Sequence, residues 1–317
     1  MLLVTGGTGF IGRHLLECLG ASGIPVRCLT RGRKVDGPVA EIAHANLETG
    51  EGLAEALRGV DAIIHLAGVT KALRREEYYF GNVRATQNLL RAAGRGVRLV
   101  HVSSLAAIGP ATGGGPVDED TEPHPVSDYG RSKLAAERAV RELAPDAVIV
   151  RPPVVYGPRD TDVFQVLKSV SRGWAFEIGA GERWFSAIYV QDLAEILARL
   201  ANGSAGAGRA YFVTHAKPVS WSGLADTAAG IMKVRLRRVK ISPHLARGVG
   251  YCAEMWALMT RTPGIVSRDK IAEALCSSWT CSSHRAAAEL AWEAATPMET
   301  GLARTLAWYR ESGWLKY

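Results

Sequence analysis

The chain has 317 residues, of which 47% are hydrophobic, so it can bury a large core and its composition argues against intrinsic disorder. Its net charge of +7 comes from arginines spread over the whole length, without a basic arm or an interleaved aromatic platform, which excludes a typical nucleic-acid binder. The five cysteines are scattered and lack metal-ligand spacing, so we expect reduced thiols, no metal and a cytoplasmic location. No apolar run reaches the ~20 residues of a membrane-spanning helix, although peripheral association stays open.

The chain begins with a short apolar strand that leads into Gly6, Gly9 and Gly12 and then into an amphipathic helix. Glycines at this spacing allow a tight turn and bring backbone N–H groups close to phosphates at the helix start. Because strand, glycines and helix follow in the required order, the segment predicts a dinucleotide-binding loop.

Strand-like and helical segments then alternate, which is typical of a parallel sheet with helices on both faces. We predict an α/β fold, namely a Rossmann-type doubly wound parallel sheet with a smaller, discontinuous C-terminal substrate-binding lobe. Ligands of such a sheet bind at the carboxyl ends of its strands. The predicted strands are 2–5, 25–30, 62–66, 97–103 and 147–151, and the predicted helices are about 10–21, 51–58, 74–93 and 128–143.

The end of the second strand indicates which dinucleotide is bound. NAD would need an acidic residue there for its adenosine ribose, whereas this chain has Arg31 followed by a glycine, Arg33 and a lysine. A guanidinium suits a 2′-phosphate, so NADP(H) is favoured over NAD(H). Two alternatives stay open: the segment is a charged surface turn, or Asp36 folds back to serve the ribose of NAD(H).

Two further segments carry acid–base chemistry. The strand at 97–103 ends at the adjacent Ser103 and Ser104, and the following helix carries Tyr129 and Lys133 one turn apart on one face. A fixed ammonium beside a phenol favours the phenolate, while a serine hydroxyl can hydrogen-bond a substrate oxygen as hydride moves. His65 lies in an apolar run and is interpreted as a packing residue.

The motifs TGGTGFIG, HLAG, GNVRATQNLL, VSS, YGRSK and RPPVVYGP occur in the order seen in extended short-chain dehydrogenases/reductases, and the resemblance covers nearly the whole chain. It implies a catalytic triad of Ser104, Tyr129 and Lys133, with Lys133 also holding the nicotinamide ribose. Ser104 is chosen over Ser103 because the family's serine precedes a glycine, here Gly109, by five residues. The resemblance also implies that the cofactor is surrounded by Gly6, Gly7, Thr8, Gly9, Phe10, Ile11, Gly12, Arg31, Asn46, Leu47, Leu66, Ala67, Gly68, Asn82, Tyr129, Lys133, Pro152, Val154 and Val155.

The type of reaction is less narrowly defined. Sugar-nucleotide dehydratases carry an Asp-Glu pair where this chain has Leu105 and Ala106, so dehydration is disfavoured. RPPVVYGP and AYFVTHAKPVSW resemble the 3β-hydroxysteroid dehydrogenase and dihydroflavonol reductase branch, which implies hydride transfer between a ketone and a secondary alcohol on an apolar or aromatic small molecule. The alternatives are a nucleotide-sugar epimerase and, less favoured, a non-catalytic NADP-binding redox sensor. For the epimerase, the cations available for a second diphosphate are Arg159, Lys168, Arg172 and Arg183.

The second half of the chain supplies the substrate lobe. Residues 186–201 read as a strand and a helix that return to the first domain, so we predict a cofactor domain of 1–157 and 186–213 and a lobe of 158–185 and 214–317. In that lobe, residues 245–259 form a helical stripe that is interrupted only by Arg247 and Glu254. A helix this apolar must be covered. We expect it in the lobe core, with a substrate lid, a dimer contact or a membrane-surface helix as alternatives, and we expect a homodimer through the helices at 83–94 and 128–143.

Overall fold

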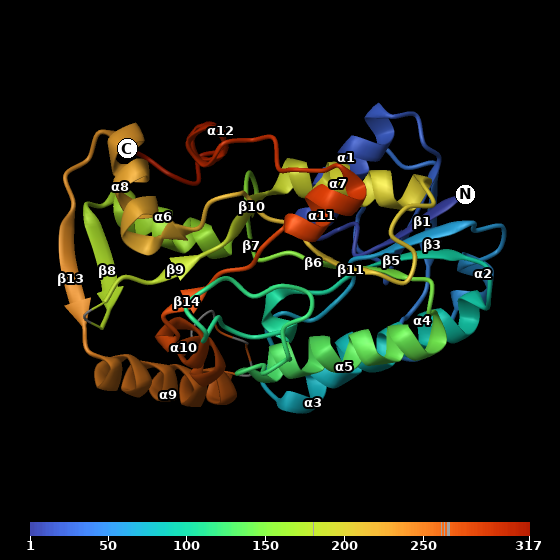
Figure 1. Cartoon of the computed structure of the whole chain (residues 1–317), viewed down its shortest axis with the longest axis horizontal. Coiled ribbons are helices and arrows are strands. Elements are labelled where there is room, and N and C mark those ends of the chain that lie inside the picture. Colours follow the sequence, from blue (N-terminus) through green and yellow to red (C-terminus); the bar gives the residue numbers. More distant parts are fainter. Residues whose placement is uncertain (180, 261, 263, 265–266) are drawn as a thin grey trace.

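The computed structural model describes residues 1–179, 181–260, 262, 264 and 267–317. A seven-stranded parallel sheet forms the centre of the first half, with the strand order β11-β6-β5-β4-β1-β2-β3 (Figure 1). Its strands are β1 (Leu2–Thr5), β2 (Val26–Thr30), β3 (Glu41–His44), β4 (Ala62–His65), β5 (Arg98–Val102), β6 (Val148–Arg151) and β11 (Ala210–Phe212). The α/β class is confirmed, and the five predicted strands are found within about one residue at each end.

Helices cover both faces of this sheet (Figure 1). On one face lie α1 (Phe10–Ala21), α7 (Val190–Asn202) and α11 (His284–Leu290), and on the other lie α2 (Leu53–Ala56), α4 (Ala85–Ala93) and α5 (Asp128–Leu143). The predicted helix at 74–93 is divided into α3 (Arg75–Tyr78), a π-helical turn (Tyr79–Arg84) and α4. The strand and helix predicted at 186–201 are β10 (Ala187–Tyr189) and α7.

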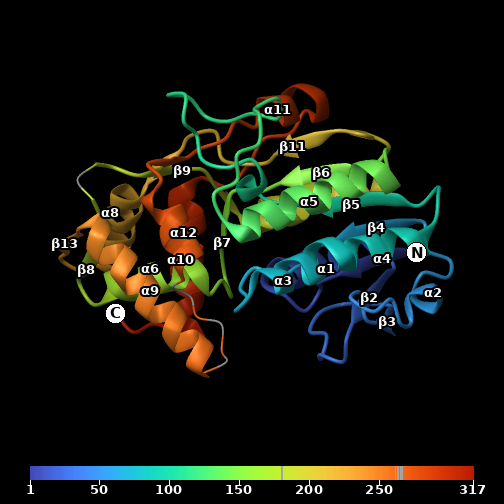
Figure 2. The same ribbon diagram turned by 90° about the horizontal axis from the view of Figure 1, so that it is seen from below.

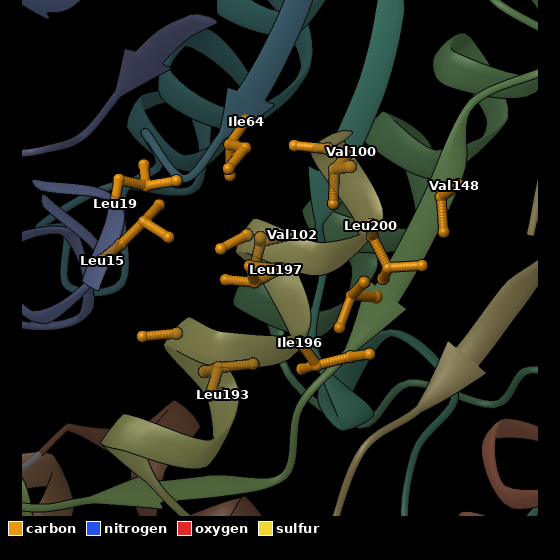
Figure 3. Close-up of a cluster of buried hydrophobic side chains, with 14 of the residues drawn as sticks. Leu15, Leu19, Ile64, Val100, Val102, Val148, Leu193, Ile196, Leu197 and Leu200 are labelled. Carbon is orange, nitrogen blue, oxygen red and sulfur yellow. The ribbon is translucent and has the colours of Figure 1, made fainter. Parts of the chain in front are cut away.

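The sheet core explains why residues 186–213 return to the first half. Leucines of α1 and α7 meet the β-branched side chains of the central strands in one buried cluster, which Figure 3 shows in close-up. Strands buried on both faces require continuous apolar runs such as those of β5 and β6. Leu290 of α11 joins the same cluster, so part of the C-terminal segment also packs on the sheet.

A buried ion pair attaches α5 to the sheet. The guanidinium of Arg151, at the end of β6, donates two hydrogen bonds of 3.0 and 2.7 Å to the carboxylate of Glu137 on α5. Both side chains are almost fully buried, and the guanidinium also lies 5.6 Å from the ring centroid of Phe212. Since Glu137 stands one helical turn after Lys133, the ion pair fixes the helix that carries the predicted Tyr-Lys pair.

A second core lies beside the carboxyl edge of the sheet and centres on Tyr156, Tyr309 and Phe185. The predicted domain boundaries stay a prediction; they divide the chain into 1–157 with 186–213 and 158–185 with 214–317. The helices here are α6 (Asp162–Ser171), α8 (Trp221–Met232), α9 (Pro243–Thr260), α10 (Arg268–Leu275) and α12 (Met298–Glu311). The strands are β7 (Val154–Tyr156), β8 (Trp174–Ile178), β9 (Trp184–Phe185), β12 (Val219–Ser220), β13 (Arg237–Ile241) and β14 (Ser278–Trp279), together with β10.

The expectation that the 245–259 stripe fills the lobe core is wrong. The stripe is helical, since it forms most of α9, but its large apolar side chains are exposed. Only small residues of α9, namely Ala246, Gly250 and Ala257, are buried. Helical periodicity therefore identified the helix correctly but not the direction of its apolar face.

Candidate functional site

The glycine loop between β1 and α1 has the close backbone packing that a dinucleotide requires. Gly6 has φ +75°, and a Cβ there would lie 2.7 Å from the backbone nitrogen of Ala67, while a Cβ at Gly12 would collide with the carbonyl oxygen of Gly6. Gly9 caps α1 without any side-chain hydrogen bond, so the first-turn N–H groups have no side-chain acceptor. Unsatisfied donors at a helix N-terminus are the site at which a pyrophosphate binds, so the residues present fit the cofactor.

The carboxyl end of β4 adjoins this loop and is held in shape by Asn82. The side-chain oxygen of Asn82 accepts a 2.7 Å hydrogen bond from the backbone nitrogen of Val69, and its amide nitrogen donates to the carbonyl of Val69 and to Ser132. A Cβ at Gly68 would lie 2.8 Å from that oxygen and 3.9 Å from Nζ of Lys133. The polar atoms of Asn82 thus hold the backbone after β4, beside Lys133.

The remaining residues predicted around the cofactor lie at the neighbouring strand ends. The side chain of Asn46 accepts a hydrogen bond from the backbone nitrogen of Glu48, and Leu47 is buried beneath it. The carbonyl of Pro152 accepts a 2.9 Å hydrogen bond from the backbone of Leu105. Four more of the residues predicted around the cofactor are half-buried: Leu66, Ala67, Val154 and Val155.

The segment after β2 forms a turn held by Thr30. Its buried hydroxyl accepts hydrogen bonds from the backbone nitrogens of Gly32 and Arg33 and donates to the carbonyl of Arg33. Arg31 projects from this turn with an exposed side chain and pairs with Glu48 at 3.2 Å. Asp36, the alternative ribose ligand, pairs instead with Arg13 at 3.1 Å.

Ser104 follows the end of β5, and Tyr129 and Lys133 lie on the first two turns of α5. The hydroxyl of Ser104 caps the following turn by accepting from the nitrogen of Ala106, and it lies close enough to Tyr129 to lower the pKa of the phenol. Ser127 begins α5 by accepting a 3.0 Å hydrogen bond from the nitrogen of Gly130, which sets Tyr129 and Lys133 in the first two turns. Nζ of Lys133 donates a 2.8 Å hydrogen bond to the carbonyl of Val102.

The electrostatic environment of this group follows from burial. Desolvation lowers the pKa of Lys133 to about 8, against a smaller raising effect of Glu137. Burial also raises the pKa of Tyr129, while Lys270 and the neighbouring hydroxyl of Ser104 lower it. In the protein alone the phenol is therefore neutral at pH 7, and nearby cations and Ser104 determine how readily it ionises.

Two histidines lie buried next to Lys133. His65 hydrogen-bonds Thr5 at 2.7 Å and Thr86 at 2.9 Å, as its interpretation as a packing residue requires. Its neighbour His101 has neither ring nitrogen within hydrogen-bond distance of any described residue, and the hydroxyl of Ser103 is in the same situation. Desolvation lowers the pKa of His65 to about 3 and holds that of His101 well below its usual range, so both rings are neutral.

Sequence reasoning missed Lys270, which belongs to α10 in the second half of the chain. Its Nζ lies 5.6 Å from the ring centroid of Tyr129 and 2.9 Å from a carboxylate oxygen of Glu273. In the sequence these two residues are three apart on a short polar helix, which is the ordinary pattern of a solvated surface pair. No local signal connects them with a tyrosine about 140 positions earlier in the printed chain.

The described residues contain neither a cluster of metal ligands nor a helix that could span a membrane. In residues 1–179, 181–260, 262, 264 and 267–317, His, Cys, Asp and Glu form no group of three or more that could hold a metal ion. In the same residues, no helix combines the length and the apolar character needed to cross a membrane.

Comparison with known proteins identifies the family. Residues 2–213 match the model of the NAD dependent epimerase/dehydratase family. The chain belongs to this family. The chain is similar to ceramide reductase of Caulobacter vibrioides, with 30% identity over 99% of this chain and 96% of that protein. It is also similar to 2-alkyl-3-oxoalkanoate reductase of Stenotrophomonas maltophilia, with 28% identity over 96% of this chain and 98% of that protein.

A solved structure of the family has the same architecture. MoeE5 in complex with UDP-glucose and NAD matches with a TM-score of 0.79 and 26% identity, over 98% of this chain and 99% of that one. These relatives are reductases and a nucleotide-sugar-binding protein on one scaffold. The chain is accordingly an NAD(P)-dependent enzyme of the extended short-chain dehydrogenase/reductase type, with an oxidoreductase or epimerase role.

Proposed function

We propose that this enzyme is an NADP(H)-dependent oxidoreductase that interconverts a ketone and a secondary alcohol on an apolar, acyl-chain or ring substrate. The proposal is supported by the position of Ser104 beside Tyr129 where β5 meets α5, and by Lys133 on the next turn of α5, where its buried Nζ donates to the carbonyl of Val102. When bound, the nicotinamide supplies or accepts the hydride. Ser104 hydrogen-bonds the substrate oxygen, Tyr129 transfers the proton to or from it, and Lys133 binds the ribose and favours the phenolate.

Three arguments favour a reductase of apolar substrates over an epimerase. Ceramide reductase and 2-alkyl-3-oxoalkanoate reductase, which match almost the whole chain, are named for a ceramide and for an alkyl-substituted oxoalkanoate. Leu105 and Ala106 stand in place of a catalytic carboxylate pair. Of the four cations considered for a second diphosphate, Arg159 pairs with Glu17 at 2.7 Å and Lys168 lies over the ring of Phe164, which leaves Arg172 and Arg183.

The preference for NADP(H) rests on Arg31. The turn held by Thr30 presents this guanidinium at the end of β2, where it forms an exposed ion pair with Glu48, and Asp36, the alternative ribose ligand, pairs with Arg13. A charge-assisted contact with a 2′-phosphate is worth about 1.5–3 kcal/mol, or roughly ten- to a hundredfold in affinity. Calorimetric titration should show that Arg31→Ala weakens NADP(H) but not NAD(H) binding, while Arg58→Ala changes neither. Equal affinity of the unaltered protein for both cofactors would refute this assignment.

Turnover assays test the reaction itself. NADPH oxidation at 340 nm is followed with a 2-alkyl-3-oxoalkanoate, an N-acyl-3-ketosphingoid base and UDP-glucose as candidate substrates. Tyr129→Phe should abolish turnover while cofactor still binds, because only the phenol moves the proton. Tyr78→Phe is the matched control, since its ring centroid lies 6.2 Å from that of Tyr129. Activity of Tyr129→Phe within a few fold of the parent would remove the mechanism.

The epimerase alternative has a separate outcome in the same screen. A nucleotide sugar would need its diphosphate bound by arginines, so its affinity should fall as salt screens them. Salt-sensitive binding of UDP-glucose, with no turnover of either ketone, would replace the reductase by an epimerase. The proposed homodimer through the helices at 83–94 and 128–143 is tested by light scattering. The molar mass is measured for the parent and for variants with substitutions on the exposed faces of those helices.

A further inference from the structure

The outward face of α9 is apolar instead of polar. Trp256 is 68% exposed, Met259 76% and Leu245 59%, although these are the side chains that water disfavours most. With 3.6 residues per turn, the exposed apolar residues cover about half of the helix circumference. The complete set is Leu245, Val249, Tyr251, Met255, Trp256, Leu258 and Met259.

The inward face of α9 explains this reversal. It presents Ala246, Gly250 and Ala257 to the rest of the protein, and a Cβ at Gly250 would lie 2.7 Å from Ile271 of α10. Small residues allow close contact with α10 and leave every large side chain on the outside. Figure 1 shows α9 along the lower edge of the molecule, and Figure 2, seen from that side, shows it in front. A contiguous exposed apolar face of this kind marks a surface that binds a partner.

One edge of this face adjoins a basic groove. The groove has a volume of about 840 Å³ and lies between α9, α10, the start of α5 and the segment 72–78. We call it the arginine groove, because its lining includes Arg74, Arg75, Arg131, Arg247 and Arg268.

The acidic residues of the groove leave a positive excess. Asp128 pairs with Arg131 at 3.0 Å and lies 3.7 Å from Arg75, while Asp269 accepts a hydrogen bond from the backbone at the start of α5. Glu254, the third carboxylate, accepts from a backbone nitrogen of α10.

Three arginines of the groove keep their charge uncompensated. Within the part of the chain that the structure describes, no carboxylate lies within 4 Å of the side-chain nitrogens of Arg74, Arg247 or Arg268. These guanidinium groups are therefore available to an anionic partner.

We propose that α9 and the arginine groove form a docking surface for an anionic lipid membrane. The apolar face of α9 enters the boundary between headgroups and acyl chains, with Trp256 and Tyr251 at the depth that amphipathic aromatic side chains prefer. The free arginines bind lipid phosphates beside it, which supplies the charge complementarity. Docking by this surface does not depend on the reaction proposed above.

The charges favour a membrane over a second copy of the chain. A two-fold interface brings the same patch of both copies together. Self-association through α9 would thus bring two arginine grooves close to each other, and like charges at an interface oppose association. An anionic bilayer instead neutralises them.

The position of α9 also connects the surface with the candidate active site. α9 packs on α10, and α10 carries Lys270, which lies over the ring of Tyr129. Only α10 therefore separates a membrane in contact with α9 from Tyr129, which would act on an apolar substrate.

Vesicle cosedimentation of the full chain, without substrate, tests the docking. The protein is mixed with vesicles of phosphatidylcholine alone or with phosphatidylglycerol added. We expect strong binding only to the anionic vesicles, and about tenfold or greater loss of binding in Trp256→Glu/Met259→Glu. Arg247→Glu/Arg268→Glu should weaken binding by at least about fivefold per residue and reduce its salt dependence. The controls Phe176→Glu and Arg58→Glu alter exposed residues elsewhere and should bind as the parent does.

A second measurement separates docking from misfolding. Brominated acyl chains should quench tryptophan fluorescence in the parent and much less in Trp256→Phe, a substitution that keeps an aromatic ring at that position. Equal binding of the parent and both double variants to anionic vesicles would overturn the proposal. So would a parent dimer in light scattering that the α9 variants convert to monomer while no form binds vesicles, because α9 would then be covered by a second copy.

Discussion

Replacement of Lys270 by Met should make Tyr129 a weaker base in alcohol oxidation. The ammonium lies 5.6 Å from the ring centroid of Tyr129 and lowers the pKa of its phenol. Methionine keeps most of the side-chain length and removes the charge, so only the electrostatic contribution is lost.

The magnitude follows from that distance. Two unit charges 5.6 Å apart interact by ~0.7 kcal/mol in water and by ~3 kcal/mol at the effective dielectric typical of a protein surface. The Lys270 side chain is 39% exposed and its ammonium lies 2.9 Å from the carboxylate of Glu273, so hydration and ion pairing reduce the effect. We therefore expect about 1 kcal/mol, which is roughly fivefold in the phenolate population at a given pH.

The assay is kcat against pH in the direction of alcohol oxidation, which requires the phenolate. The rising limb of the Lys270→Met profile should move to higher pH, and the rate on that limb should fall about fivefold. Lys270→Arg should retain the parent profile. Glu273→Gln should move the limb to lower pH, because this carboxylate raises the pKa of Tyr129. An unchanged limb in Lys270→Met, or a shift of the same sign in Glu273→Gln, would refute the electrostatic reasoning.

Further predictions concern stability and cofactor binding. Both buried histidines have folded pKa values below the ordinary 6.5, so the stability they contribute is present above pH 6.5 and is lost as pH falls. In urea unfolding, His101→Leu should raise the free energy of unfolding by about 1 kcal/mol, and by more at pH 5, because the ring nitrogens of His101 have no hydrogen-bond partner among the described residues. His65→Leu should lower it, because His65 hydrogen-bonds Thr5. A less stable His101→Leu variant would show that His101 has a partner. Glu137→Gln should cost ~3–5 kcal/mol by leaving buried Arg151 unpaired, and a cost below ~1 kcal/mol contradicts this. Gly12→Ala should abolish calorimetric cofactor binding, because its Cβ collides with the glycine loop.

The sequence was most informative where local rules and tertiary packing agree. α1 and α5 have the bounds that were predicted for them, 10–21 and 128–143, and the glycines and Ser127 at their starts satisfy the backbone requirements of a helix N-terminus. β3 was missed because this edge strand is short and exposed, so it lacks the apolar run of a buried strand. The π-helical turn before α4 leaves no periodic signal either.

In the candidate site too, residues that are close in sequence could be predicted, and a residue that arrives through tertiary packing could not. Ser104, Tyr129 and Lys133 are close in sequence and belong to adjoining elements, so their spacing could be interpreted. Lys270 reaches Tyr129 only through the packing of α10 against the start of α5, which no local pattern encodes. For α9, hydrophobic periodicity predicted a helix with one apolar face, but the partner of that face depends on tertiary structure.

The return of residues 186–213 to the sheet also bears on how the protein is made. β6 ends at residue 151, and its outer neighbour β11 begins only at residue 210. At ~5–20 residues per second on the ribosome, the edge of β6 waits on the order of 3–12 seconds for its partner. α11, which packs against β11, emerges later still. During this interval the nascent chain exposes an unpaired apolar strand, so the protein should depend on chaperones during its synthesis more than its folded stability suggests.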